Sequence, residues 1–558
     1  MVTLRLRTII PLLFLIIFTL IIRLYKLDVV PASLFGDEID ASYHAWSLGT
    51  TLRDYSGQLL PTYIHSLSEW RAPLLMYVLA PFVSFLGPSA WSARLPMAIL
   101  GTASVFLVFL IFRKLYPKKF SAALLAALFV SISPLHFHYS RNAVEQPPLF
   151  FLLTLGIYLY LRFRHKLSHL VLSLIVFTLT FYTYSVANIL TPSIILLLLI
   201  FFPIPKKEFL NWKNYPYMII PLLLMLPISF HLFFGQAAGR FKLISVFSDT
   251  KSSDQVVIDR IKPWVAGQPL EFVYNNRPLV VFSKFSSNYL NALSWQNLFL
   301  TGDSNYRQQV DRFGSFLILT LPLFLFGLIK VITGSKEDKF FCFVLLVSPI
   351  ASALTVDGSN HASRLFFLIF PVASITALGA DSLLNVSHLR YLTFFFLSLV
   401  LMNFSSYLYR YFYHYRYEST HVWQYGYEEL FAKAKPFFEN ANRVFINNTH
   451  EPTLYRFGFY AAIQPSEFQQ SFSSDVPQDQ IVPNFNGFVF GTKYYFGTAG
   501  NIDNVISMLR EGDVYLAAQG KEVPGDWDLE KDPPKELKVL ATVRNYLNQP
   551  LFYVLALR

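Results

Sequence analysis

Long apolar segments recur along the chain as far as residue 409 and constrain its fold more than any other feature. A helix needs about 20 apolar residues to cross a bilayer. Of the 558 residues, 54% are hydrophobic and only 15% are charged, which is too apolar for a water-soluble enzyme. We therefore expect an all-α polytopic membrane domain over residues 1–410. Its eleven predicted spans are 8–22, 93–112, 120–137, 148–162, 168–184, 187–204, 215–234, 314–332, 340–356, 364–380 and 391–409.

Basic residues predict the orientation of these spans. The first segment follows Arg5 and Arg7 and resembles a signal peptide, but no small-residue cleavage site follows it, so we expect a retained anchor with a cytoplasmic N-terminus. With that start, sixteen Lys and Arg fall in inner segments, and seven fall in outer connections when the loop 236–312 is left aside. Positive charge inside is the usual pattern. The seven outer residues are Arg23, Lys26, Arg53, Arg71, Arg94, Arg141 and Arg364.

The stretch from Pro73 to Leu86 is apolar but only about 14 residues long. Counting it as a span would reverse the distribution of positive charge in every later loop. We therefore expect a helix that lies in, or dips into, the outer face of the membrane.

The last part of the chain, residues 411–558, is more polar and alternates helix-like with strand-like segments. Helices are expected at 425–440 and 501–511, and strands at 443–447, 487–490, 514–518 and 552–557. This pattern predicts a small α/β domain outside the cytoplasm. With the first outer loop (27–92) and the loop 236–312, it offers three outer elements large enough to hold chemistry.

The first outer loop has the most informative residue pattern. Directly after the anchor comes Phe35-Gly36-Asp37-Glu38-Ile39-Asp40, followed by Gly57, Pro61 and then Glu69-Trp70-Arg71-Ala72-Pro73-Leu74. Leu86-Gly87 and Ala93-Arg94-Leu95-Pro96 open the next span. Acids alone would fit a solvated loop, but here they come in a fixed order with basic residues, Gly and Pro.

This order resembles the polyprenyl-phosphate-sugar glycosyltransferases of the C-type superfamily, which includes the protein O-mannosyltransferases of family 39 and aminoarabinose transferases. The resemblance is strongest over residues 33–150 and weaker at Asn360-His361-Ala362-Ser363-Arg364. It implies an integral-membrane enzyme of the cell membrane that moves a monosaccharide from a polyprenyl phosphate to an extracytoplasmic lipid, glycan or protein.

The resemblance also assigns roles to the acids. Asp37 matches the catalytic aspartate, which takes the proton of the acceptor hydroxyl while the anomeric carbon is attacked with inversion. Phosphate leaves without help from an acid, so one base is enough, in contrast to the carboxyl pair of glycoside hydrolases. Glu38 is expected to orient groups or bind the sugar, because residues 37 and 38 of a helix point about 100° apart.

Arginine suits the lipid phosphate because its charge is fixed and its donors form a fork. Arg71 occupies the family's basic position before Pro-Leu and is the first choice. Further candidates for substrate or phosphate binding are Tyr43, Arg94, Arg141, His361 and Arg364. For each arginine the alternative is snorkelling at a helix end. Where some family members have a phosphate-binding Arg, three residues after the aspartate, this chain has Asp40, which puts the mode of phosphate binding in doubt.

Other motifs point to no bound cofactor. His136-Phe137-His138 lacks a carboxylate at metal-ligand spacing, and a divalent ion at Asp37, Glu38 and Asp40 is possible but not favoured. Trp423-Gln424-Tyr425-Gly426 resembles the oligosaccharyltransferase signature too incompletely to count. No nucleotide-binding glycine loop occurs, and the net charge of +11 suits cytoplasmic loop ends better than nucleic-acid binding.

Two other classes of function remain open on the sequence. A multi-pass transporter or flippase would place ionisable residues within its spans, whereas the acids here lie at their outer ends. A non-catalytic envelope scaffold would keep the topology but would give Asp37 no special role.

Overall fold

The computed structural model describes residues 2–558 except 67–68, 210–214 and 236–243. The chain forms two compact units. The helical unit comprises Met1–Tyr25, Thr62–Leu74 and Met97–Phe412, and the mixed unit comprises Lys26–Pro61, Leu75–Pro96 and Tyr413–Arg558. Two pieces of the first outer loop therefore fold together with the C-terminal residues.

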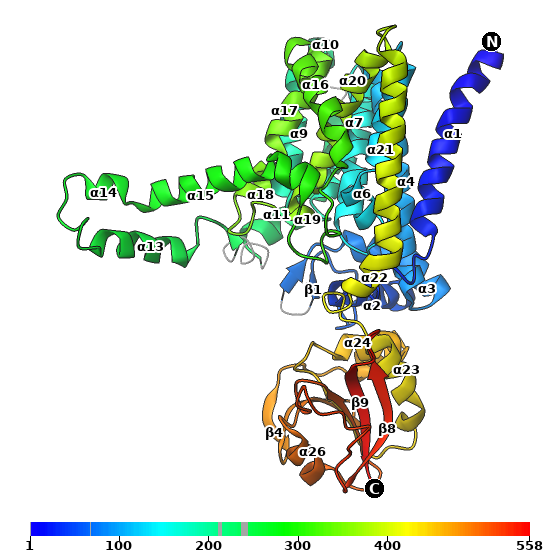
Figure 1. Cartoon of the computed structure of the whole chain (residues 1–558), viewed down its shortest axis with the longest axis vertical. Helices are drawn as coiled ribbons and strands as arrows, with labels where there is room; N and C mark the ends of the chain where they lie inside the picture. The colour runs from blue at the N-terminus through cyan, green and yellow to red at the C-terminus, as the bar shows by residue number, and fades with distance from the viewer. Residues whose placement is uncertain (1, 67–68, 210–214, 236–243) are drawn as a thin grey trace. The chain divides into compact units, whose positions relative to one another are not determined.

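Helices dominate the chain as far as residue 418 (Figure 1). They are α1 (Val2–Leu24), α2 (Gly36–Thr51), α3 (Leu74–Leu86), α4 (Ala90–Leu115), α5 (Phe120–Ser131), α6 (Pro134–Tyr139), α7 (Gln146–Phe163), α8 (Leu167–Thr180), α9 (Ala187–Phe201), α10 (Lys206–Phe209), α11 (Tyr215–Phe233), α13 (Thr250–Ile261), α14 (Glu271–Tyr274), α15 (Arg277–Ala292), α16 (Leu321–Thr333), α17 (Lys336–Val347), α18 (Ile350–Ala353), α19 (Ala362–Leu365), α20 (Ile369–Leu384), α21 (Arg390–Arg410) and α22 (Arg416–Glu418). Residues Gln296–Leu300, Ile318–Thr320, Phe366–Leu368 and Tyr411–Tyr415 form short 3-10 or π helices.

Each of the eleven predicted spans contains a helix, and the predicted helix at Pro73–Leu86 is α3. Among the described residues, three helices are long and apolar enough to cross a bilayer: Ala90–Leu115, Ala362–Leu384 and Arg390–Glu418. Ile318–Thr333 and Lys336–Ala353 meet that test only as a pair bent by 118°. Six further apolar segments in the described residues are 10–17 residues long: Ile9–Leu24, Leu74–Leu86, Phe120–Ser131, His169–Thr180, Ala187–Phe201 and Pro216–His231. The membrane character is therefore clear, but the number of eleven spans is not confirmed.

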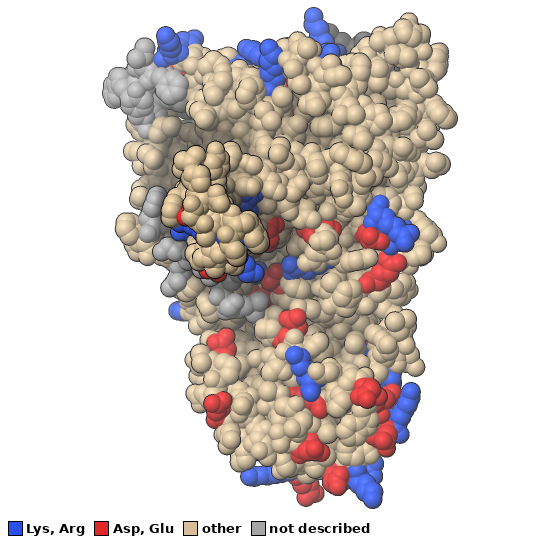
Figure 2. Space-filling model, turned by 60° about the vertical axis from the view of Figure 1, so that its left-hand side comes forward, with Lys and Arg blue, Asp and Glu red and all other residues tan. Residues whose placement is uncertain are grey.

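The surface of the helical unit fits a membrane-embedded helix bundle. On the face drawn in Figure 2, Lys and Arg side chains gather at the end that carries α10, and a broad band free of charged side chains follows. Such a band suits the hydrocarbon layer, where an exposed charge is costly. Which end faces the cytoplasm stays a prediction from the basic residues.

Helix α20 forms the centre of the helical unit, because every residue from Ile369 to Asp381 is buried. Its contact with α16 depends on glycine. A Cβ added at Gly327 would lie 2.0 Å from the carbonyl oxygen of Ile375, and one at Gly379 would lie 2.2 Å from that of Leu323. The two backbones thus approach as closely as small-residue contacts between membrane helices allow.

The mixed unit contains a seven-stranded sheet in the order β4-β5-β6-β3-β7-β9-β8. The central strands β6, β3 and β7 are parallel and the outer neighbours are antiparallel. The strands are β3 (Val444–Asn447), β4 (Gln478–Val482), β5 (Phe485–Phe490), β6 (Tyr494–Thr498), β7 (Val514–Ala518), β8 (Leu537–Arg544) and β9 (Pro550–Leu557). The helices among them are α23 (Tyr427–Phe438), α24 (Leu454–Tyr460), α25 (Pro465–Ser471) and α26 (Ile502–Met508). The predicted α/β character of this region is confirmed.

Side chains that alternate along the strands pack the sheet on both faces. Phe445 of β3 belongs to a core with Ile502, Val505 and Met508 of α26. On the other face, the ring of Phe457 in α24 lies 4.6 Å from that of Tyr494 in β6. A buried carboxylate, Glu522, joins the ends of the parallel strands, since it accepts hydrogen bonds from Asn447 (2.5 Å), Thr498 (2.8 Å) and the backbone N–H of Ala518 (3.2 Å).

The glycine contact of α16 and α20 gives a first prediction. We expect Gly327→Val to lower the free energy of unfolding by about 1–3 kcal/mol, because overpacking must push the two backbones apart. The midpoint of thermal unfolding in detergent measures this. Gly525→Val is the control, since a Cβ at Gly525 meets nothing within 4 Å, and equal midpoints for the two variants would contradict the account.

Candidate functional site

Helix α2 places the three acids of the first outer loop in different surroundings. Gly36, Asp37 and Glu38 form its first turn, where the helix dipole favours negative charge. The carboxylate of Glu38 accepts a hydrogen bond from the backbone N–H of Phe35 at 3.0 Å and so caps the helix. Glu38 is 1% exposed and Asp40 is fully buried, whereas Asp37, which precedes both, is only partly buried.

Glu38 forms a buried ion pair with Arg94, near the start of α4. The Nε of Arg94 lies 3.2 Å from Oε1 of Glu38, and Nη2 lies 3.1 Å from Oε2. The remaining guanidinium donors reach the carbonyl oxygens of Leu27 (3.2 Å), Pro31 (3.1 Å) and Ser33 (2.6 Å). Arg94 thus uses all five of its N–H groups on the protein, and this geometry favours a positioning role over phosphate binding.

Asp40 belongs to a second buried cluster. Tyr55 donates a hydrogen bond to Oδ1 of Asp40 at 3.2 Å, and the ring of His44 stacks on Tyr55 with centroids 3.8 Å apart. Burial and the charge of Asp40 raise the pKa of Tyr55 well above its usual value, so the phenol keeps its proton. Asp40, three residues after Asp37, therefore accepts a hydrogen bond that stabilises the structure.

Tyr43 faces the C-terminal part of the mixed unit. It is fully buried, its hydroxyl donates to the carbonyl oxygen of Ile463 at 3.0 Å, and its ring packs 4.9 Å from that of Phe468. Burial raises the pKa of this phenol too. The contacts fix α2 on α24 and α25, so we expect Tyr43 to act through the position of the helix.

Three residues from the C-terminal region surround the first turn of α2, and the sequence alone did not single them out as site residues. The backbone N–H of Gly36 donates to Oε1 of Gln424 at 2.9 Å, and Arg456 donates to the same oxygen. A Cβ at Gly36 would lie 2.8 Å from the hydroxyl of Tyr455 and 2.9 Å from Nη2 of Arg456. A side chain at position 36 would have to move the ends of Tyr455 and Arg456. The short Trp423–Gly426 resemblance was the sole sequence feature near these residues.

Arg71 belongs to the helical unit and lies on a ribbon of two short strands, β1 (Ile64–Ser66) and β2 (Glu69–Arg71). Its Nη1 is 4.0 Å from Oε1 of Glu145, and the two side chains are 11% and 16% exposed. The neighbours Trp70 and Ala72 pack on a cluster that contains Ile228 and Met225. Arg71 is thus held at a partly buried position by apolar residues on either side of it in sequence.

An apolar groove of about 460 Å³ runs between α8, α9 and α11. Phe181 and Met225 line this groove and also belong to the cluster under Trp70 and Ala72. A hydrogen bond of 2.9 Å from the N–H of Leu74 to the carbonyl of Tyr182 fixes the end of the ribbon there. The other lining residues are Leu174, Phe177, Thr178, Pro192, Ile195, Leu196, Leu199, Met218, Pro221 and Leu222.

Arg141 is fully buried and contacts the C-terminal end of α1. Its Nη1 donates to the carbonyl oxygens of Ile22 (3.2 Å) and Arg23 (2.6 Å), and its guanidinium lies over the rings of Tyr411 and Phe412. Terminal carbonyls of a helix need such donors, and a cation there is stabilised by the helix dipole. This geometry supports a positioning role for Arg141.

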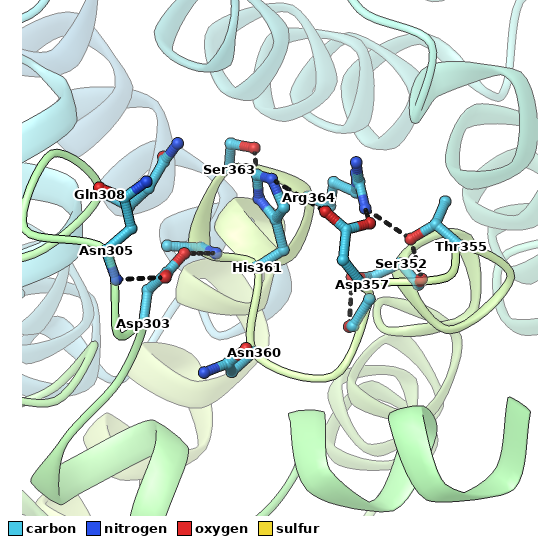
Figure 3. A network of polar contacts seen from close by, with 12 residues as sticks. Asp303, Asn305, Gln308, Ser352, Thr355, Asp357, Asn360, His361, Ser363 and Arg364 are labelled. Carbon is cyan, nitrogen blue, oxygen red and sulfur yellow. Dashed lines mark hydrogen bonds and ion pairs between the residues drawn. The ribbon is translucent and has the colours of Figure 1, made fainter. Parts of the chain in front are cut away.

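His361 and Arg364 join a polar network at the loop before α19 (Figure 3). Arg364 pairs with Asp357 and donates to Thr355 at 2.6 Å, while His361 Nδ1 lies 2.9 Å from the hydroxyl of Ser363. Burial and the charge of Arg364 lower the pKa of His361, so its imidazole is neutral at pH 7. Asp303 accepts a hydrogen bond from the N–H of Ala362 at 3.0 Å and ties a second loop to the network.

The described part of the chain holds no group of three or more His, Cys, Asp or Glu placed to bind a metal ion. His136 lies 2.8 Å from Nη2 of Arg23, and His138 Nε2 lies 2.8 Å from the carbonyl oxygen of Arg307. Both imidazoles thus face hydrogen-bonding partners of the protein. That the reaction needs no metal stays a prediction.

The ion pair of Glu38 and Arg94 gives a second prediction. Glu38→Ala leaves a buried guanidinium without its carboxylate, and we expect a loss of about 3–5 kcal/mol in unfolding free energy. Glu38→Gln, which keeps a hydrogen-bond acceptor, should lose less. Thermal unfolding in detergent distinguishes the two, and an unchanged midpoint for Glu38→Ala would show that the pair contributes nothing.

Comparison with known proteins agrees with this architecture. The family model described as dolichyl-phosphate-mannose-protein mannosyltransferase matches residues 70–233, which include Arg71, Arg94, Arg141 and the groove helices. No curated protein matches the chain. The resemblance to the C-type glycosyltransferases is confirmed by this match together with the fold.

Solved structures show the same fold. ArnT from Cupriavidus metallidurans in the apo state has a TM-score of 0.53 and 11% identity, over 97% of both chains. The structure of the same protein bound to undecaprenyl phosphate gives 0.52 and 10%, again over 97% of each chain. The archaeal oligosaccharyltransferase AglB from Archaeoglobus fulgidus, with a TM-score of 0.44, 14% identity and coverage of 81% of this chain and 63% of its own, is too distant to add to this.

Proposed function

We propose that the chain is a membrane glycosyltransferase that moves a monosaccharide from a polyprenyl phosphate to an acceptor outside the cytoplasm. The observation that carries this proposal is the apolar groove of α8, α9 and α11, which shares Phe181 and Met225 with the cluster beneath the Arg71 ribbon. The family match includes both the groove and Arg71. A relative in fold, ArnT, has been solved with undecaprenyl phosphate.

The groove suits a prenyl chain on physical grounds. Each CH₂ group that leaves water contributes about 0.8 kcal/mol, and the lining offers Leu, Ile, Phe, Met and Pro side chains, with Thr178 as its one hydroxyl residue. A lipid lying there would bring its phosphate toward the ribbon that carries Arg71. Arginine is the residue best suited to a phosphate, because its forked donors match the oxygens.

Asp37 is the acid that we assign as the general base. The reaction forms a bond between the acceptor oxygen and the anomeric carbon, breaks the bond to the phosphate, and sends the hydroxyl proton to the carboxylate. Glu38 and Asp40 are buried and bound by Arg94 and Tyr55, whereas Asp37 is partly exposed at the start of α2. Inversion at the anomeric carbon follows from a single displacement.

The groove and Arg71 give a prediction for lipid binding. We expect Arg71→Ala to raise the Kd for undecaprenyl phosphate about 10- to 100-fold, since hydrogen bonds to charged groups contribute about 1.5–3 kcal/mol. Ile195→Trp, which fills the groove, should weaken binding as well. Native mass spectrometry of the full chain in nanodiscs measures both.

Two matched variants control this experiment. Arg312→Ala removes an arginine that is 76% exposed, and Leu172→Trp enlarges a half-exposed α8 residue outside the groove. Both should bind the lipid like the unmodified chain. Wild-type affinity in Arg71→Ala and Ile195→Trp would refute the groove as the donor site.

The role of Asp37 is tested by transfer. With undecaprenyl phosphate mannose and undecaprenyl phosphate glucose, radiolabelled in the sugar, as donors in native membranes, we expect Asp37→Asn to lower any transfer at least 100-fold, in the range of general base catalysis. Lipid binding should persist. Asp28→Asn, an exposed acid of the same loop, is the control, and substantial transfer by Asp37→Asn would exclude Asp37 as the base.

A further inference from the structure

A helical arm projects from the helical unit and has no part in the proposed reaction. This arm consists of residues 249–292 and includes α13, α14 and α15 (Figure 1). In Figure 1 it runs across the direction of α21 and α4, with α14 at its far end. Its two long helices pack on one another only in part, and many of their apolar side chains reach the surface.

The base of the arm is attached near the C-terminal end of α17. Lys336 and Lys339 lie at the opposite, N-terminal end of that helix. Asn288 of α15 donates to the carbonyl oxygen of Thr355 at 2.8 Å, and Tyr289 donates to that of Leu346 at 2.7 Å. Since α17 begins at Lys336 and runs toward α18, the arm leaves the bundle at the end opposite its basic residues. By the positive-inside pattern this is the outer membrane surface.

The arm exposes more apolar area than a segment in water should. Its side chains with 58–71% exposure are Val257, Ile261, Trp264, Leu270, Phe272, Tyr274, Phe282 and Leu290. So many exposed apolar side chains on one arm are typical of a contact with another molecule or a membrane. Trp, Tyr and Phe, interleaved with Lys and Arg, are typical of a bilayer interface.

Helix α15 is amphipathic in the sense that a bilayer surface requires. Phe282 and Leu290 are 66% and 67% exposed, while Ser287 and Asn291 are also exposed on the same helix. Ser287 lies about 140° around the helix from Phe282, at about 100° per residue. Ser287 therefore lies on a different side of the helix from Phe282, whereas Leu290, about 80° from Phe282, lies on the flank between the two.

An apolar cavity of about 610 Å³ lies beside Phe282, where α15 meets Leu354. Phe247, Val281, Phe282, Phe285 and Leu354 line it together with Pro278 and the exposed Arg277. A cavity with apolar walls and one arginine matches a phospholipid, whose acyl chain is apolar and whose phosphate is anionic.

We infer that the arm lies on the outer bilayer surface, with the Phe282 side in the lipid and an acyl chain of an outer-leaflet phospholipid in the cavity beside Arg277. Five basic and four acidic residues nearly balance in the arm, and Lys262 and Lys284 pair with Asp259 and Asp249. Burial of apolar area, and not attraction to anionic lipid, therefore supplies most of the binding.

Fluorescence quenching tests this inference. The single cysteine is removed with Cys342→Ser, and Phe282→Cys, Phe272→Cys or Ser287→Cys is introduced and labelled with an environment-sensitive dye. The full chain is reconstituted in phosphatidylethanolamine vesicles containing a lipid with a nitroxide in the upper acyl chain. We expect quenching at 282 and 272 at least threefold stronger than at 287, with the reverse order for iodide in water.

Each other outcome decides against the inference. Equal lipid quenching at the three positions would show that the arm does not lie with its Phe282 side in the bilayer. Iodide quenching at 282 and 272 without lipid quenching would place the arm in water, free for an acceptor. Loss of both together with dye self-quenching at high protein density would indicate a second copy as the occupant. The result is independent of glycosyl transfer, because no donor is present.

Discussion

The buried ion pair of Glu38 and Arg94 ties the first turn of α2 to the segment before it and to the start of α4. Arg94 joins the carboxylate to three backbone carbonyls of the segment 27–33. In a site of low dielectric, a charge without a partner would cost several kcal/mol. The pair therefore holds the first turn of α2 in place, and Asp37, the residue before Glu38 in that turn, is partly exposed.

The same constraint sorts the arginines of the outer loops. Arg94 and Arg141 are fully buried and bound to backbone carbonyls, and Arg364 is paired with Asp357. Arg71 lies 4.0 Å from Glu145, and its ribbon packs against residues that also line an apolar groove. Under the proposed function, Arg71 would contact the phosphate of a lipid whose prenyl chain lies in this groove.

Much of this could be predicted from the sequence, for physical reasons. Long apolar runs identified the helices, and short strand-like segments in the polar C-terminal region identified β3, β5, β7 and β9. The roles of Asp37 and Arg71 come from the family resemblance and stay predictions. Strands of three residues, such as β2, are too short to show a period. Gln424, which also accepts from Arg456, meets Gly36 across 388 residues of chain, a contact that no local pattern encodes.

A structure of the full chain in nanodiscs with undecaprenyl phosphate would test the central claim most directly. The account predicts density for the prenyl chain between α8, α9 and α11 and for the phosphate within hydrogen-bonding distance of Arg71. Lipid density ordered elsewhere, with the groove empty and Arg71 still beside Glu145, would contradict it.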